Sequence, residues 1–372
     1  TEIYTLSLHD ALPIWLASIW YWKDSDNGSM RPALLLALLP LALFAGEYGQ
    51  PSERTIFRAL ERKDPALLKQ ILRDHAESVA FRDSVAHSPL MRAILSGNQA
   101  LAGQLLMNGA DANPPGVPEP PLHLSILLEM DQVFSLLLEK GAAVEALTYG
   151  GHSPLHMAAH RGNALATAKL LERKARSDLP DGQGRTPLHL AAMRGHTQIM
   201  RLLIAANALR EARSKAGLTP FLEAVAANQL ESVTFLLSTD NKEWLKATRE
   251  ATDPAGRGAL HLAAEVDSPE LVRLLLFHGL NKDLQDKAGF SPLHLAARDG
   301  REGALRALLD AGANPRLLSL SLQTPLELLN TRDRSFANAA RIQFFLQQAA
   351  YRQSIEYLKN TSAQSDGHTS PQ

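Results

Sequence analysis

The chain has 372 residues, with 38 Lys and Arg against 39 Asp and Glu. This near balance gives no support to a nucleic-acid partner, which normally requires a basic patch. The sequence contains no cysteine, and this excludes disulfides, cysteine-based zinc sites and a thiol nucleophile. The length also exceeds what one hydrophobic core usually supports, unless the chain is an array whose core grows in one direction.

The first 29 residues are unlike the remainder of the chain. Residues 1–15, which read TEIYTLSLHDALPIW, resemble a translated sequencing adapter, and the first residue is not methionine. Three of the four tryptophans lie within the first 22 residues. We therefore expect residues 1–29 to be an artefactual or non-native extension that precedes a true start at Met30.

Residues 30–45 have the pattern of a secretory signal peptide. Arg31 supplies a positive charge, an apolar stretch follows from Ala33 to Phe44, and small residues at 45 and 46 suit a cleavage site. The apolar stretch has 12 residues, whereas a membrane-spanning helix needs about 20. We therefore expect a cleaved signal peptide and a periplasmic or secreted protein. A retained membrane anchor and a cytoplasmic protein are the alternatives.

From residue 51 onward, a tetrapeptide recurs at a nearly constant step. Thr186–His189 reads Thr-Pro-Leu-His, Ser153–His156 precedes it by 33 residues, and Thr219–Leu222 follows it by 33. The copies begin near residues 55, 88, 120, 153, 186, 219, 258, 291 and 324. Because a fixed period of this size indicates one small unit stacked many times, we interpret this part of the chain as a repeat array.

The unit that begins at Thr186 predicts two short helices. Thr186 suits a helix N-cap, and Pro187 suits the first helical position. Leu188 begins an apolar helix face, Gly195 ends the first helix, and residues 199–203 carry the apolar face of the second. One such pair cannot bury both faces alone, so neighbouring pairs must cover it.

This unit resembles the ankyrin repeat. Asp181 to Gly195 matches every fixed position of the family pattern, and Asp286 to Gly300 matches it almost as fully. The resemblance covers residues 51–357 and implies about nine repeats in an all-α fold. That fold is a solenoid of stacked helix-turn-helix units with β-hairpin loops. It also implies terminal repeats that act as caps, the first near Thr55 and the last near Thr324.

The chain beyond the last tetrapeptide has a different pattern. Ser335 to Lys359 predicts a longer closing helix with one apolar face. Residues 360–372 are rich in Ser, Gln and Gly, and we expect them to be a disordered tail.

Histidine is the only abundant residue type that suggests catalysis or metal binding. His123, His156, His189, His261 and His294 all occupy the fourth position of the tetrapeptide, and in ankyrin repeats this histidine is structural. His152, His156 and His160 are spaced by four residues, but a metal site there is the less favoured interpretation because His152 precedes the helix. The sequence has no catalytic, phosphate-binding or calcium-binding motif. We expect no enzymatic activity, cofactor, metal or small-molecule substrate.

The positions that the repeat leaves free are the candidates for function. In the family that the chain resembles, the hairpin tips and the exposed side of the first helices line one concave face. Residue types favoured in interfaces gather there. The candidates are Tyr149, His152, His160, Arg161, Gln183, Arg185, Met193, Arg194, Lys215, Leu218, Arg257, Glu265, Phe290 and Arg298. We expect a groove with a mildly basic centre, in which Arg161, Arg185 and Arg194 meet the carboxylates of an acidic partner. An ordinary solvated surface is the alternative.

The step from Thr219 to Gly258 is 39 residues instead of 33, and the extra residues lie near Asp240 to Thr252. Insertions of this kind fall in loops on one face of an array. Trp244 lies in the insertion, either as a further anchor for the partner or as a cover for the gap between units. Because Leu222 replaces the histidine and Gly258 replaces the threonine, this boundary is expected to be the weakest.

Together these features predict a non-enzymatic scaffold or modulator of bacterial exported type that binds a protein partner on the concave face. A membrane-anchored or host-directed intracellular adaptor is the alternative, in which the uncleaved apolar segment adds the membrane as a partner. An enzyme with an unrecognised site is a third class, which nothing in the sequence favours.

Overall fold

The structure is a computed structural model that describes residues 51–83, 87–117, 119–238, 242–331 and 338–366. These residues form nineteen α-helices and one short 3-10 helix, with no β-strand among them. None of the helices in these ranges is both long and apolar enough to cross a membrane. The expected extension over 1–29 and the signal peptide over 30–45 lie outside the described residues.

The chain divides into two compact units, which we describe separately. Unit 1 comprises the described residues up to Gly182 together with Ala205–Asn207. Unit 2 comprises Gln183–Ile204 and the described residues from Ala208 onward.

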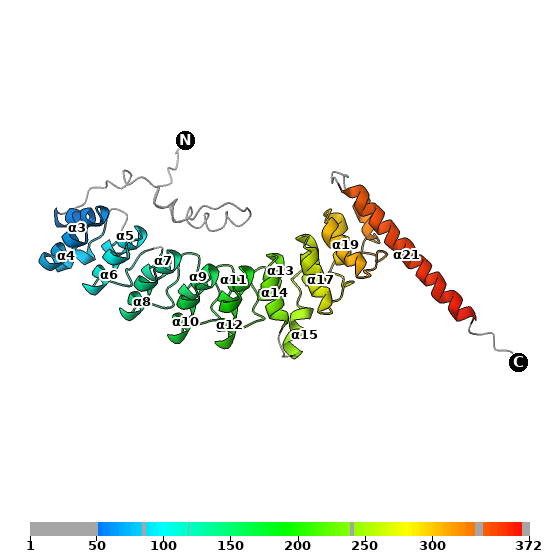
Figure 1. Ribbon diagram of the computed structural model, residues 1–372, viewed down its shortest axis with the longest axis horizontal. Coiled ribbons are helices and arrows are strands. Elements are labelled where there is room, and N and C mark those ends of the chain that lie inside the picture. Colours follow the sequence, from blue (N-terminus) through cyan, green and yellow to red (C-terminus); the bar gives the residue numbers. More distant parts are fainter. Residues whose placement is uncertain (1–50, 84–86, 118, 239–241, 332–337, 367–372) are drawn as a thin grey trace, which may run out of the picture. The chain divides into compact units, whose positions relative to one another are not determined.

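Unit 1 consists of paired helices that stack in two layers (Figure 1). The first helices contact one another in succession, from α3 to α5, α7 and α9, and the second helices do the same from α4 to α6, α8 and α10. The pairs are α3 (Pro51–Glu61) with α4 (Pro65–Asp74), α5 (Pro89–Leu95) with α6 (Gln99–Met107), α7 (Pro121–Leu127) with α8 (Asp131–Glu139), and α9 (Pro154–Arg161) with α10 (Ala164–Glu172). The 3-10 helix η2 (Ala76–Ala80) follows α4.

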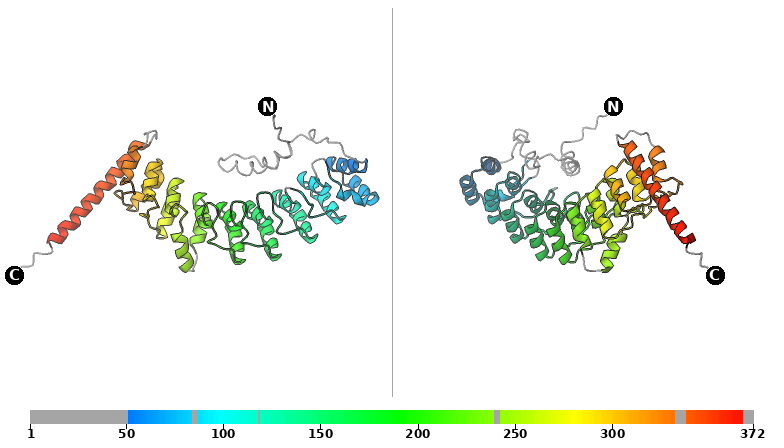
Figure 2. Two further views of the ribbon diagram at one scale, coloured as in Figure 1. Left: turned by 180° about the vertical axis from the view of Figure 1, so that it is seen from behind. Right: turned by 45° about the vertical axis from the view of Figure 1, so that its right-hand side comes forward.

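Unit 2 repeats this plan, and the same layering is visible from behind (Figure 2). Its first helices are α11 (Pro187–Met193), α13 (Pro220–Ala226), α16 (Ala259–Glu265), α18 (Pro292–Arg298) and α20 (Pro325–Thr331). Its second helices are α12 (Thr197–Ala205), α14 (Leu230–Leu237), α17 (Pro269–Phe277), α19 (Glu302–Asp310) and α21 (Ala339–Asp366). The extra helix α15 (Lys242–Glu250) lies in the long step and contacts α14.

The core of each pair follows the pattern predicted from the sequence. Leu188 and Leu203 are fully buried, with Ala191 and Ala192 buried between them on the first helix. Small alanines on the first helices allow the layers to approach closely. Asn207, which lies where other copies have glycine, adopts a left-handed conformation with φ of 61°, as expected for a residue that follows a helix end.

Three features of the fold differ from the sequence-based expectations. Helix α3 begins at Pro51, so Thr55 lies inside the helix and does not cap it; no proline follows Thr55 to fix a helix start there. The expected β-hairpin loops contain no strand in the described ranges. The connections are tight turns, and only an isolated bridge joins Thr252 to Gly258.

The third difference concerns the C-terminal end. Helix α21 spans 28 residues and continues to Asp366, so residues 360–366, expected to be disordered, are helical. No proline or glycine interrupts the sequence before Gly367. The N-terminal part of α21 buries Ile342 and Leu346 and contacts α19 and α20.

Candidate functional site

Three of the first helices, α9, α11 and α18, are fixed at their start by the tetrapeptide histidine. The peptide N–H of Thr186 donates to Nδ1 of His189 over 3.1 Å, and the Thr186 hydroxyl lies 2.9 Å from the same nitrogen. Ser153 with His156 and Ser291 with His294 repeat this arrangement. In these copies the start of the helix, and therefore the adjoining hairpin tip, has a defined position.

Tetrapeptide histidines also connect successive repeats, through a bond from Nε2 to a carbonyl 29 residues further on. In His189, His261 and His294 a peptide N–H donates to Nδ1, so the imidazole proton lies on Nε2 and is donated to that carbonyl. The Nε2–O distances are 3.0 Å from His123 to His152, 3.1 Å from His189 to Leu218, 2.9 Å from His261 to Phe290, and 3.0 Å from His294 to Gln323. The predicted structural role of these histidines is confirmed.

This arrangement needs neutral imidazoles. Burial lowers the pKa of His123 to about 4, and it also lowers the pKa values of His261 and His294. Among the described residues Nδ1 of His123 has no hydrogen-bond partner, because Pro120 stands at the cap position and has neither an N–H nor a hydroxyl. His123 therefore lacks the cap bond that His189 and His294 make.

The hairpin tips are connected by a second series of bonds. We call tips the segments 148–152, 181–185, 214–218, 253–257, 286–290 and 319–323. In all of them except 181–185, the N–H of the first residue donates to the carbonyl of the fifth across the turn. The N–H of the second residue in a tip donates to the carbonyl of the third residue in the preceding tip. These bonds run from Gly182 to Gly150, Lys215 to Gln183, Lys287 to Ala255, and Leu320 to Ala288, over 2.8–3.0 Å.

The tip-to-tip bond is missing at one boundary in unit 2. Pro254 is the second residue of its tip and has no N–H to donate to Ala216. The Arg213 guanidinium bridges this boundary instead, donating over 2.7 Å to the carbonyls of Gly217 and Thr252. This is also the boundary with the long step, where Leu222 cannot form the histidine bond.

We call the tips and the exposed sides of the first helices the tip surface, and in unit 1 it carries four predicted residues. Tyr149 is 81% exposed. His152 is partly buried, with Nε2 3.3 Å from a carboxylate oxygen of Asp181, and His160 is also partly buried. Arg161 donates to the Leu127 carbonyl over 3.1 Å and lies 3.8 Å from Glu129. Arg161 is therefore partly held by contacts with its own chain.

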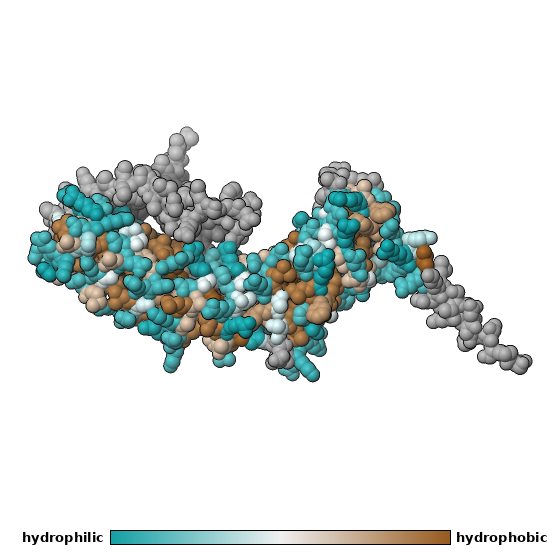
Figure 3. All heavy atoms as spheres, viewed as in Figure 1, coloured by the Kyte–Doolittle hydropathy of each residue, from teal (hydrophilic) through white to brown (hydrophobic). Residues whose placement is uncertain are grey.

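In unit 2 the predicted residues of the first two tips differ in exposure. Gln183 and Lys215 are exposed, whereas Arg185, Met193, Arg194 and Leu218 are partly buried. Figure 3 shows polar residues alternating with apolar areas over the face in view. Recognition on such a surface depends on individual side chains.

Further along unit 2, the predicted residues Arg257, Glu265 and Arg298 form one ionic network. Arg257 bonds to Asp253 and to Glu265, each over 2.7 Å. Arg298 forms a bidentate pair with Asp299 over 2.7 and 2.8 Å and lies 3.9 Å from Glu265. The bonds to Asp299 raise the pKa of Arg298. Two cations face three carboxylates here, so this part of the surface has no excess of positive charge.

Phe290, the remaining predicted residue of the tip surface, is partly buried. Its ring lies 5.8 Å from that of His294, and its carbonyl accepts the bond from His261. The position therefore serves the repeat scaffold as well as the surface.

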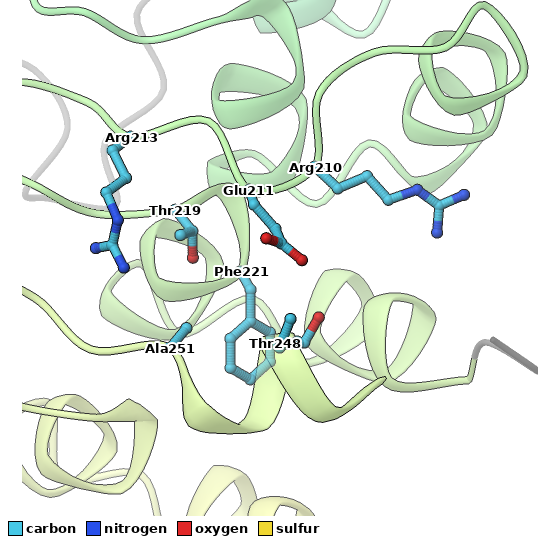
Figure 4. A pocket seen from close by; sticks show the side chains of 8 residues that line it. Arg210, Glu211, Arg213, Thr219, Phe221, Thr248 and Ala251 are labelled. Carbon is cyan, nitrogen blue, oxygen red and sulfur yellow. The ribbon is translucent and has the colours of Figure 1, made fainter. Parts of the chain in front are cut away.

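The insertion creates a shallow pocket within unit 2 (Figure 4). The pocket is lined by Arg210, Glu211, Arg213, Thr219, Phe221, Ala247, Thr248 and Ala251. Glu211 points toward Phe221 and Thr248, while Arg210 points away from them. The Arg210 guanidinium lies over the ring of Trp244, and burial lowers the pKa of Arg210 to about 10. These contacts favour the interpretation in which Trp244 covers the gap between neighbouring repeats.

Sequence reasoning missed several residues of this surface. Asp253 and Asp299 complete the ionic network, and their spacing of four and one residues from the arginines was the available signal. The leucines at 318, 320 and 322 in the last tip were also missed, although aligning the tips places Leu322 where the others have glycine. Across the described ranges, no three His, Asp or Glu side chains are arranged to hold a metal ion.

The comparisons with known proteins give one consistent result. A family model described as ankyrin repeats matches three times, at residues 90–181, 155–247 and 242–318, which together exceed half of the chain. No curated protein gives a significant match.

Two of the solved structures that are similar to the chain illustrate the match. One is the ankyrin repeat domain of Bcl-3, described as a unique member of the IkappaB protein family, with 27% identity and a TM-score of 0.50 over 63% of this chain and 99% of that one. The other is the human ASB11 ankyrin repeat domain, with 24% identity and a TM-score of 0.53 over 62% of this chain and 98% of that one.

Proposed function

The chain belongs to the ankyrin-repeat family, and from this premise we propose that it is a non-enzymatic protein that binds a protein partner on its tip surface. The observation that carries the proposal is the double series of bonds beneath that surface. The histidine bonds fix the helix starts, and the N–H bonds fix the tips. The side chains that the repeat does not use are therefore displayed on a rigid backbone.

Rigidity matters because association must offset the entropy lost when loops and side chains become ordered. A tip whose backbone is already held by two neighbours loses little further freedom when a partner binds. Several polar side chains of the tips bond to one another, as Arg257 does with Asp253. Such a surface supports binding of a partner rather than catalysis of a reaction.

We propose that an acidic segment of the partner binds at the end of unit 2 that carries Arg185, Arg194 and Lys215. The neutralised network around Glu265 makes the other end of unit 2 less suited to a carboxylate-rich ligand. Charge complementarity at this end would orient the partner along the tips.

The test begins with a pull-down from the native source followed by mass spectrometry, and the purified partner is then titrated by calorimetry. Replacing Arg185, Arg194 and Lys215 with Ala should weaken binding by about 2 kcal/mol for each true anchor, and affinity should fall as salt rises. The matched control replaces the exposed Lys242 and Arg273 on α15 and α17. Equal, salt-independent affinity of the triple variant would refute the basic end as the binding site.

We also propose nine repeats, beginning near residues 55, 88, 120, 153, 186, 219, 258, 291 and 324 and spanning 51–357. The first helices of the later copies support this count, since eight of them begin one residue after these positions, from Pro89 to Pro325. In this proposal the first and last copies act as caps. Deletion of one complete copy at a time, followed by denaturant unfolding, would test the boundaries.

The cellular location is a separate proposal, which rests on the sequence from Met30 to Gly46. We propose export after cleavage of a signal peptide, with a membrane-anchored or intracellular adaptor as the second candidate. Mass spectrometry of the mature N-terminus in the native source distinguishes the two. A mature chain that begins after residue 45 supports export, and a chain that retains Ala33–Phe44 supports anchoring.

A further inference from the structure

The last tip, residues 319–323, differs from the five other tips in its backbone. Its fourth residue, Leu322, has φ of 57°. The other tips have glycine at this position, namely Gly151, Gly184, Gly217, Gly256 and Gly289, with φ between 74° and 81°. The left-handed region disfavours residues with a Cβ atom, and a branched side chain such as Leu is rarely found there. The tip therefore holds a strained residue where glycine serves elsewhere.

In this segment the apolar side chains are exposed and a polar side chain is buried, which is the reverse of the usual distribution. The sequence from 318 to 322 reads Leu-Ser-Leu-Ser-Leu. Leu320 and Leu322 are each 76% exposed and Leu318 is 49% exposed, whereas Ser319 is buried at 3%. Apolar side chains at alternate positions normally turn toward a core. Here they face solvent.

The backbone of this tip has an open acceptor. The Leu320 N–H donates to the Ala288 carbonyl over 3.0 Å. In the preceding tips the carbonyl of the third residue receives the N–H of the next tip, except at Pro254. The equivalent group here is the Ser321 carbonyl, and no backbone N–H of the described residues donates to it. The series of tip bonds ends at an exposed edge that another chain can extend.

We propose that the last tip, residues 319–323, together with Leu318 is a docking site for an extended segment of a partner protein. The segment donates a backbone N–H to the Ser321 carbonyl and places apolar side chains, at alternate positions, against Leu320 and Leu322. Addition of such a strand explains why the strained Leu322 is retained at an exposed position. It also explains why the acceptor of Ser321 is unused beside apolar side chains.

A peptide fits these observations better than a lipid bilayer does. The Ser321 carbonyl lies beside the exposed leucines, and hydrocarbon offers no donor for a carbonyl group. A peptide backbone supplies a donor and apolar side chains together. The site is separate from the end of unit 2 that carries Arg185 and Arg194, so either proposal can fail without the other.

The test uses the full chain and a displayed library of random ten-residue peptides. Peptides are selected against the wild type, counter-selected against Leu320→Ser/Leu322→Gly, and then measured by fluorescence anisotropy. The double variant should bind the selected peptides about tenfold more weakly. The matched control is Lys287→Ser, which changes the residue equivalent to Leu320 in the preceding tip and should leave affinity unchanged.

Two further measurements separate docking from a structural role. Leu322→Gly alone should raise the melting temperature while weakening peptide binding, because it removes strain and an apolar contact together. Methylation of one backbone nitrogen of the selected peptide should weaken binding by up to about tenfold, as expected for the loss of one main-chain bond.

Three results would overturn the proposal. The first is a failure to enrich any peptide whose binding depends on Leu320 and Leu322. The second is binding of wild type, but not of the double variant, to phosphatidylcholine vesicles. The third is concentration-dependent self-association in sedimentation velocity that the double variant abolishes, since this would assign the leucines to contacts between copies of the chain.

Discussion

Two neighbouring interfaces in unit 2 are built from the same repeat but held together differently. Between α11 and α13, His189 bonds to the Leu218 carbonyl and Lys215 bonds to the Gln183 carbonyl. Between α13 and α16, Leu222 replaces the histidine and Pro254 replaces the N–H donor, so both bonds are absent. Arg213 and the helix α15 take their place.

The comparison shows that apolar packing and polar links are independent parts of this fold. Leu222 is fully buried and Leu260 nearly so, so the apolar core continues through the insertion. Because stability in a repeat array is a sum of unit and neighbour terms, one boundary can be weakened while the others keep their strength.

The largest expected effect is on the shared apolar core. Leu188→Ala should lower the free energy of unfolding by about 2–5 kcal/mol, because Leu188 is fully buried and its truncation leaves a cavity. Denaturant unfolding measures the loss. The control is Leu165→Ala on α10, where the side chain is 44% exposed. Unchanged unfolding of the Leu188 variant would contradict its place in the core.

The second effect tests the histidine links through pH. The pKa of His123 is lowered from 6.5 to about 4 in the folded chain, so the unfolded chain binds more protons between these values. The contribution of His123 to stability is therefore constant above about pH 6.5 and falls by a few kcal/mol as pH decreases towards 4. The lowered pKa values of His261 and His294 act in the same direction.

Urea unfolding at pH 7 and pH 4.5 measures this dependence. His123→Gln should reduce the loss between the two pH values, because the amide does not titrate. A variant with the same pH dependence as the wild type would show that His123 does not carry it.

The third effect compares the two interfaces directly. Amides in α15 and the tip at 253–257 should exchange hydrogen earlier than those of the tip at 214–218. Two missing hydrogen bonds of about 1 kcal/mol each set the expected difference in opening free energy. Hydrogen-exchange mass spectrometry resolves these segments, and uniform protection across residues 214–258 would contradict a weak boundary.

The smallest effect concerns the bridging side chain before the tip. Arg213 and Gln285 occupy equivalent positions, and each donates to two carbonyls on either side of a boundary. Arg213→Ala should cost about 1 kcal/mol and Gln285→Ala about half of that, because only the second boundary keeps its tip-to-tip bond. Thermal unfolding of the two variants provides the measurement, and equal losses would mean that the bridge at Arg213 does not replace the missing bond.

The sequence was most informative where local chemistry alone determines structure. The N-caps, the first-turn prolines and the buried Leu188 follow from spacing and residue type. It was least informative where the outcome depends on which side chains meet across repeats. The pairing of Arg257 and Arg298 with Asp253, Glu265 and Asp299 depends on side-chain geometry that no periodicity encodes. Strain at Leu322 was likewise hidden, since it appears only when the tips are aligned and the backbone angle is known.

The links between repeats also determine how unit 2 responds to tension. When a chain of this kind is pulled from its ends, the links act in series, and each boundary carries the same load. The boundary bridged by Arg213, with neither a histidine bond nor a tip bond, is the one that yields at the lowest force. Stretched in an optical trap, the segment from α16 onward would separate from α13 before either part unravels. Under tension the interface at the insertion therefore separates first, while the repeats on either side of it remain folded.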